Sequence, residues 1–147
     1  MAELLNEDIK EQIREVFDQL KEPVKVLFFG RSDACEYCDD ARQLVEEVTA
    51  LSEQLSLEMY DLDQDTDLAS QYRVDKAPGM VLVGMEGDQV IDFGIRYSGI
   101  PSGHEFTSLI HDLVLVSGRD SGLRENTRQM LNKVSKPIHL QVFVTPT

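Results

Sequence analysis

The chain has 147 residues, of which 41% are hydrophobic, and a formal net charge of −13 at pH 7. This length suits one domain with enough apolar residues for a core, and no apolar run approaches the ~18 residues of a membrane span. Because contacts to phosphate require clusters of Lys and Arg, the acidic composition argues against nucleic acid as a partner.

The N-terminal segment, MAELLNEDIKEQIREVF, is charged throughout and lacks the apolar stretch of a secretory signal. We therefore expect a cytoplasmic protein with no membrane partner. In that compartment a disulfide is usually transient and functional rather than structural.

The first half of the chain shows periodicity of both helices and strands. Residues 3–20 place apolar side chains mostly three and four positions apart, which predicts an amphipathic helix that ends before Pro23. Residues 24–29, VKVLFF, are short, β-branched and aromatic and predict a strand. The helical period returns over residues 36–54 and predicts a second helix.

The next segments alternate strand and helix patterns again. Residues 55–63 alternate apolar and polar side chains, which predicts a strand, and residues 66–74 predict a short helix. Residues 80–83 and 89–94 predict two strands that the turn MEGDQ joins as a hairpin.

Ser102 and Glu105 fit a capping box ahead of an apolar helical stripe that reaches Val116. The predicted order is thus one helix followed by β-α-β-α-β-β-α. A β-α-β unit, a hairpin and a closing helix predict an α/β protein with a mixed sheet flanked by helices.

The C-terminal part differs in composition from the rest. We expect a domain over residues 1–118, a linker at 119–136 with a short helix at 123–134, and an apolar strand at 137–147. This last segment begins with Pro137, much as Pro23 directly precedes the strand at 24–29, and predicts the opening strand of a truncated second unit. An unpaired apolar strand invites pairing, so a homodimer formed through it is a further expectation.

Cys35 and Cys38 are the only cysteines and form a C-x-x-C pair within SDACEYCDDAR. The pair could be half of a metal site, a structural disulfide or a redox couple. Zinc needs about four ligands, and the other candidates, His104, His111 and His139, form no H-x-x-x-H pair. We therefore expect no metal site, although a cluster shared between two chains stays open on ligand count.

The arrangement strand–CEYC–helix resembles the thioredoxin/glutaredoxin superfamily. About forty residues after Cys38 comes KAPG, in which Pro78 opens the third strand, where that superfamily carries a cis-proline beside its dithiol. The stretch RYSGIPSGHEF and the ending VFVTPT make the chain similar to the N-terminal unit of the two-unit protein disulfide oxidoreductases, or glutaredoxin-like proteins. This resemblance implies a thioredoxin-like fold with an extra N-terminal helix, and a second C-x-x-C unit after residue 147.

The sequence also departs from these relatives. No Trp precedes Cys35 and no Gly-Pro separates the cysteines. Apolar Phe29 stands where thioredoxins place a buried Asp, so their usual proton acceptor is absent. Tyr37 resembles the tyrosine of glutaredoxins, but Glu36 replaces their proline.

If the helix begins near Cys35, its free N–H groups favour a thiolate there, with Cys38 one turn further on and more buried. We therefore predict a thiol–disulfide oxidoreductase in which Cys35 is the nucleophile and Cys38 resolves the mixed disulfide. Tyr37, Ala77 and Pro78 are the predicted substrate-binding residues. No bound cofactor is expected; the partners are protein disulfides and, as electron donor, a small thiol or a flavin-dependent reductase.

Acidic residues surround the dithiol and oppose ionisation of a thiol, which predicts a reducing or intermediate potential. They also leave a second interpretation open. In it the chain is a non-catalytic structural or substrate-docking module of a larger redox protein. A Cys35→Ser variant separates the two, because it abolishes activity in the first case and leaves partner binding intact in the second.

Overall fold

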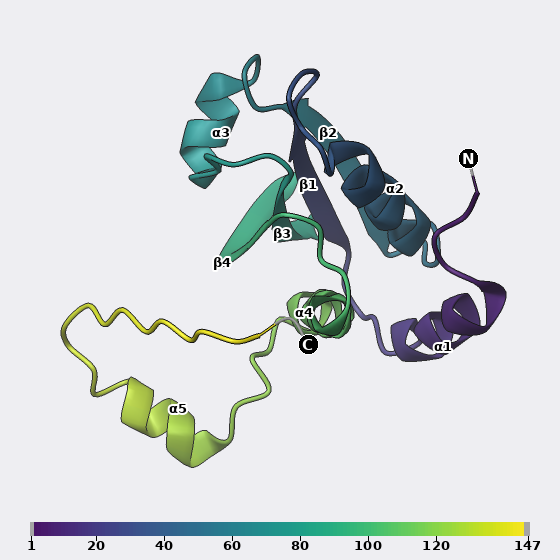
Figure 1. Ribbon diagram of the computed structural model, residues 1–147. Coiled ribbons are helices and arrows are strands. Elements are labelled where there is room, and N and C mark those ends of the chain that lie inside the picture. Colours follow the sequence, from purple (N-terminus) through teal and green to yellow (C-terminus); the bar gives the residue numbers. More distant parts are fainter. Residues whose placement is uncertain (1, 146–147) are drawn as a thin grey trace.

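The computed structural model describes residues 2–145, which form one four-stranded mixed sheet with helices on both faces (Figure 1). The strands are β1 (Val24–Gly30), β2 (Leu55–Asp61), β3 (Gly79–Glu86) and β4 (Gln89–Ser98). The helices are α1 (Glu7–Phe17), α2 (Cys38–Thr49), α3 (Thr66–Tyr72), α4 (His104–Gly118) and α5 (Glu125–Leu131). The predicted element order and the α/β class are confirmed.

The strand order is β2-β1-β3-β4. β1 runs parallel to β2 and antiparallel to β3, and β3 and β4 form the predicted hairpin. A two-residue turn joins Glu86 to Gln89, and Gly87 in that turn has a φ of 59°, which glycine adopts without steric cost.

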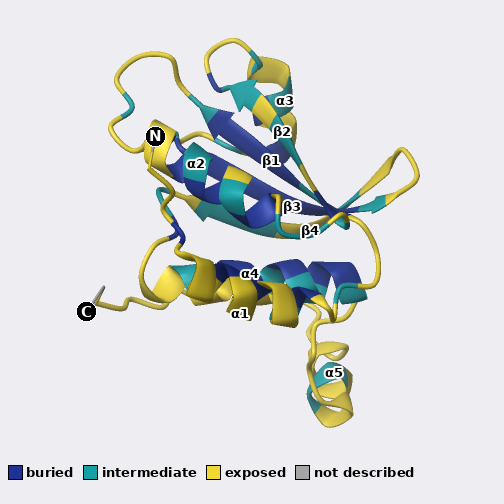
Figure 2. Ribbon diagram, turned by 90° about the vertical axis from the view of Figure 1, so that its right-hand side faces the viewer, coloured by how far each residue is buried: buried dark blue, intermediate teal, exposed yellow. Residues whose placement is uncertain are grey.

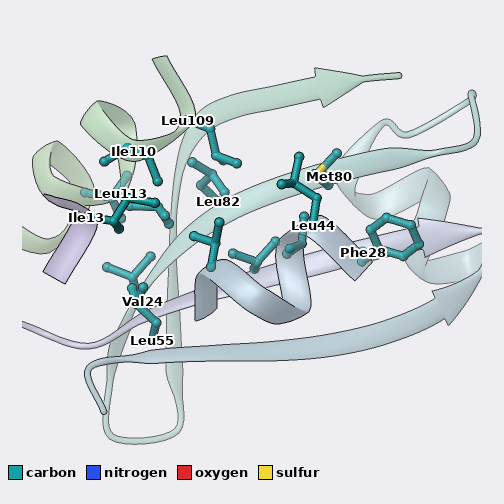
Figure 3. Close-up of a cluster of buried hydrophobic side chains, with 14 of the residues drawn as sticks. Ile13, Val24, Phe28, Leu44, Leu55, Met80, Leu82, Leu109, Ile110 and Leu113 are labelled. Atoms are coloured by element: carbon teal, nitrogen blue, oxygen red, sulfur yellow. The ribbon is translucent and has the colours of Figure 1, made fainter. Parts of the chain in front are cut away.

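One face of the sheet carries the larger core. α1, α2 and α4 pack on this face, and their apolar side chains meet those of β1 and β3 (Figure 3). Val24, Val26 and Phe28 supply the β1 side of this core, since alternate residues of a strand point to the same face. The apolar stripe that predicted each helix is therefore the stripe that it buries.

The opposite face carries a smaller core beneath α3. Leu27 and Phe29 of β1 pack there with Val81 and Val83 of β3. The central strands β1 and β3 are thus buried on both faces, which accounts for their nearly continuous apolar sequences.

Several predicted boundaries move. α1 is shorter than residues 3–20, because Asn6 caps its N-terminus by accepting a hydrogen bond from the N–H of Ile9. α2 ends at Thr49 rather than at residue 54, since the backbone there turns so that the N–H of Val24 can bond the carbonyl of Gln54. β4 extends beyond residue 94 to Ser98.

The predicted capping box at Ser102 and Glu105 is wrong. α4 begins at His104, and its N-cap is Gly103, which makes no side-chain cap bond. Gly103 adopts a φ of 61° and turns the chain there, so Ser102 lies one position too early to cap the helix.

The C-terminal part lies outside the sheet (Figures 1 and 2). α5 has no buried residue, and it is shorter than the predicted helix at 123–134. Residues 137–145 join no strand among the described residues, and five of their apolar side chains are 66–89% exposed: Ile138, Leu140, Val142, Phe143 and Val144. Residues 146 and 147 lie outside the described residues, and the proposed opening strand of a second unit stays a prediction.

Within residues 2–145, no helix is long and apolar enough to cross a membrane.

Candidate active site

Cys35 and Cys38 are joined by a disulfide, with their Cα atoms 5.4 Å apart. The loop after β1 carries Cys35, which is half-buried, and Cys38 is the first residue of α2 and only 8% exposed. The expectation that the second cysteine is the more buried one is confirmed.

The expectation that the helix begins near Cys35 is wrong. Ala34 has a φ of 54°, and Tyr37 is the N-cap, whose carbonyl accepts a hydrogen bond from the N–H of Ala41. The free N–H groups of the helix therefore start at Cys38, and Cys35 precedes the first turn.

Pro78 lies at the same edge of the sheet as the dithiol. Phe29 pairs with Gly79 in the antiparallel β1–β3 ladder. The next residue of β1, Gly30, leads into the dithiol loop, and its neighbour across this edge is Pro78, which leads into β3. The Ala77–Pro78 peptide bond is cis, as the resemblance implied. Pro78 is buried and Ala77 is half-buried.

Tyr37 stands beside the dithiol with half of its side chain exposed. Tyr37 lies between the two cysteines in the chain. The resemblance had placed Ala77 and Pro78 beside the dithiol, and the β1–β3 register brings Pro78 to the edge of the sheet that carries the Cys35 loop.

A polar hollow of about 320 Å³ adjoins the dithiol and was missed by the sequence analysis. It lies between the start of α2 and the carboxyl ends of β1 and β2. Its walls include both cysteines together with Phe28, Gly30, Arg31, Ser32, Asp39, Arg42, Met59, Tyr60 and Asp61. The sequence could have indicated this hollow by position, because the carboxyl ends of parallel strands such as β1 and β2 meet at one edge of a sheet.

The charges around the hollow are partly paired. Arg31 binds Asp63 at 3.0 Å, and Arg42 binds Asp39 at 3.2 Å. The hydroxyl of Ser32 and the N–H of Asp63 both donate to Asp61 and hold the pKa of that carboxyl below its usual range.

Three further carboxylates remain unpaired around the dithiol. Asp33, Glu36 and Asp40 are exposed and make no ion pair among residues 2–145, so the rim of the site is negative. A negative rim favours approach of cationic partners.

In the described part of the chain, no three His, Cys, Asp or Glu side chains gather as a metal site would require. His104 and His111 lie on α4, and His139 lies in the C-terminal segment outside the sheet. The fold does not bring these histidines to the dithiol.

A C-x-x-C disulfide between the first strand and the second helix, with a cis-proline before the hairpin, defines a class of protein. The chain has a thioredoxin-like fold, and its Cys35–Cys38 pair supports a thiol–disulfide oxidoreductase module. No protein-family model matches it.

Several known proteins resemble the chain over most of its length. An alkyl hydroperoxide reductase subunit of Staphylococcus aureus is 26% identical over 145 residues, which are 98% of this chain and 25% of that protein. The structure of the alkylhydroperoxide reductase AhpF of Enterococcus faecalis superposes with a TM-score of 0.78 at 26% identity, over 90% of this chain and 62% of that chain. A protein disulfide oxidoreductase from Aeropyrum pernix gives a TM-score of 0.74 at 26% identity, over 87% of this chain and 54% of that chain.

The chain therefore spans about a quarter of the length of the reductase subunits that it matches in sequence. It spans about half of the Aeropyrum pernix oxidoreductase.

Proposed function

We propose that this chain exchanges disulfides with other proteins through Cys35 and Cys38. The observation that carries the proposal is the Cys35–Cys38 disulfide itself, in which a half-buried cysteine precedes α2 and a buried cysteine begins it. Such a pair gives an incoming partner access to one sulfur and shields the other.

In the direction that reduces the substrate, the Cys35 thiolate attacks one sulfur of a substrate disulfide. The substrate S–S bond breaks, one substrate sulfur leaves as a thiolate, and a mixed disulfide with Cys35 forms. The Cys38 thiol loses its proton and attacks the Cys35 sulfur, which releases the second substrate thiolate and restores the Cys35–Cys38 bond. Two electrons have then passed from the protein to the substrate.

The edge that carries Pro78 supports docking of an extended substrate segment. The carbonyl of Pro78 accepts a hydrogen bond from the N–H of Gly99, whereas within residues 2–145 no hydrogen bond occupies the backbone groups of half-buried Ala77. Ala77 can therefore pair with substrate backbone beside the dithiol, as strand addition requires. Tyr37 would border the same segment with its exposed ring.

The similarity to reductase subunits supports a particular electron donor. The match covers nearly the whole chain but only a quarter of the alkyl hydroperoxide reductase subunit. In our proposal a flavin-dependent reductase, as a partner or as a further domain, reduces Cys35–Cys38 in the cytoplasm. A small thiol is the other donor that the chemistry allows.

The same comparison supports the domain division. Residues 1–118 would form the thioredoxin-like unit and 119–136 the linker, while 137–147 would open a second unit. The exposed apolar side chains of residues 138–144 support this role, because they have no core of their own. Pairing of two such segments in a homodimer is the other way to cover them.

An equilibrium titration of the Cys35–Cys38 couple in thiol redox buffers, read by the mass shift of alkylated thiols, tests the function. We expect a reversible two-electron transition between roughly −180 and −270 mV, the range of working dithiol oxidoreductases. A pair that never changes state in these buffers would contradict the proposal. A Cys35→Ser variant that still binds its partner would then favour a docking module.

A further inference from the structure

The sulfur of Cys38 faces a position where β1 has no side chain. A Cβ atom added to Gly30 would lie 3.8 Å from Sγ of Cys38 and 3.1 Å from the ring of Phe28. Phe28 points to the face that α2 covers, and Gly30, two residues on, points the same way. The glycine therefore leaves only a narrow space against the buried sulfur, because an added Cβ would press on the Phe28 ring.

This space belongs to the polar hollow beside the dithiol. Gly30 pairs in register with Asp61 across the parallel β1–β2 ladder, about 4.8 Å away, so the Asp61 side chain lies on the same face. The hydroxyl of Ser32 donates to that carboxylate at 2.8 Å. A hollow of about 320 Å³ with several polar groups is large enough to hold water, since one molecule takes ~30 Å³.

A second observation indicates water in the hollow. Arg42 lines it, and the Nε–H of Arg42 is buried with no hydrogen-bond acceptor among the described residues. A buried donor of this kind is normally satisfied by protein or by ordered water. A water molecule in the hollow would supply that acceptor.

The end of β1 near the dithiol has no acidic or basic side chain that could take the Cys38 proton. Phe28 is packed under α2, and Phe29 stacks on Tyr60 on the opposite face of the sheet. The charged groups that line the hollow are those of Arg31, Asp39, Arg42 and Asp61. Cys38 nevertheless has to lose a proton each time it closes the disulfide.

We propose that Gly30 is a positioning residue for the Cys38 chemistry, because its missing side chain keeps open the water-filled hollow through which the Cys38 proton leaves. The inference rests on the proposed function. When Cys38 attacks the mixed disulfide, its new bond to the Cys35 sulfur forms, the partner leaves as a thiolate, and the Cys38 proton passes to a water molecule in the hollow.

The test is the rate of disulfide closure in the purified, reduced chain. An excess of dithiobis(nitrobenzoate) reacts with Cys35 in a first phase whose rate rises with reagent concentration. Closure by Cys38 releases a second coloured thiolate at a rate independent of that concentration. The variants are Gly30→Ala and Gly30→Ser, with Gly118→Ala as control because a Cβ there meets nothing within 4 Å.

We expect Gly30→Ala to slow the second phase about tenfold and to leave the first phase unchanged. A tenfold slowing is smaller than the loss of a directly positioned acid or base would cause. Gly30→Ser has the same Cβ but carries a hydroxyl that can replace the water, so closure should recover to within about threefold of the wild-type rate. Equal slowing by Ala and Ser would show a purely steric effect and overturn the inference. Wild-type rates in both variants would also overturn it.

Asp61→Leu fills the hollow from β2 instead and keeps the inference testable if Gly30→Ala fails to fold. Its second phase should slow as in Gly30→Ala, and a wild-type rate would contradict the inference. If the wild-type protein itself shows no second phase, the proposed function fails rather than the role of Gly30.

Discussion

The hydroxyl of Ser117 makes two hydrogen bonds to the backbone of Glu22, donating to its carbonyl at 2.7 Å and accepting from its N–H at 3.0 Å. The same hydroxyl accepts from the N–H of Lys21 at 2.8 Å. Ser117 is fully buried in α4, and Lys21 and Glu22 lie in the connection that leads into β1. One side chain thus fastens the end of the last packed helix to the start of the central strand.

Ser117→Ala should therefore destabilise the fold by about 1–2 kcal/mol, because it removes three part-buried hydrogen bonds to the backbone of Lys21 and Glu22. Urea unfolding at neutral pH measures this loss. Ser108→Ala on the exposed side of the same helix is the control and should stay within ~0.5 kcal/mol of the wild type. A Ser117→Ala variant as stable as the control would show that water satisfies these groups.

Glu47 fastens the N-terminal segment to α2 and should make its attachment sensitive to acid. Burial raises the pKa of Glu47, but the N–H groups of Leu4 and Leu5 and the amide of Gln43 donate to the carboxylate and bring its pKa below the usual 4.5. A lowered pKa in the folded state contributes stability above the unfolded value and loses it as the pH falls through the folded value.

Glu47→Gln should thus be less stable than the wild type at pH ~7, and the difference should shrink as the pH falls below about 4. Urea unfolding of both proteins at several pH values measures this. Glu46→Gln, an exposed neighbour on α2, controls for the change in net charge. A difference that stays constant down to pH ~3 would contradict the role of the carboxylate.

Cys38→Ser should trap the reaction halfway. Cys35 can still attack a substrate disulfide, but no thiol remains to resolve the mixed disulfide. Non-reducing electrophoresis and intact mass should show a covalent complex that a reducing agent dissolves. Cys35→Ser is the matched control and should give no complex, because Cys38 is buried. Equal trapping by both variants would refute the assignment of nucleophile and resolving thiol.

The negative rim should select among disulfides by charge. The reduced chain should react about tenfold faster with the dication cystamine than with the dianion dithiodipropionate. To correct for the intrinsic reactivity of each reagent, its rate with the chain is first divided by its rate with dithiothreitol. The preference should fall as salt is raised, since salt screens exposed charges. A Glu36→Lys, Asp40→Lys double variant should weaken or reverse it. A ratio indifferent to salt and to both substitutions would remove electrostatics as the cause.

Local sequence was sufficient for much of the fold and for the reactive pair. Apolar side chains at periods of 3.6 and 2 predicted the helices and strands in the right order, because each element buries the stripe that its own period creates. The C-x-x-C spacing left several roles open, and the resemblance favoured a redox pair, which the structure shows as a disulfide. Pro78 was recognised through its position in the same pattern.

The boundaries were less predictable, because caps depend on single backbone angles. Ser102 and Glu105 have the residue types of a capping box, but the positive φ of Gly103 moves the start of α4 beyond Ser102. The turn at Ala34 likewise moves the start of α2 from Cys35 to Cys38.

By itself, the sequence determined the α/β architecture, the spacing of the dithiol and its acidic surroundings, since these follow from residue types and short-range periodicity. Only the tertiary structure decided which residues stand next to the sulfurs. Gly30 and Asp61 are 31 positions apart yet pair in register, and Ser117 reaches back 95 residues to Glu22. Such contacts depend on strand register and helix packing, which bring distant segments together and leave no local signal in the chain.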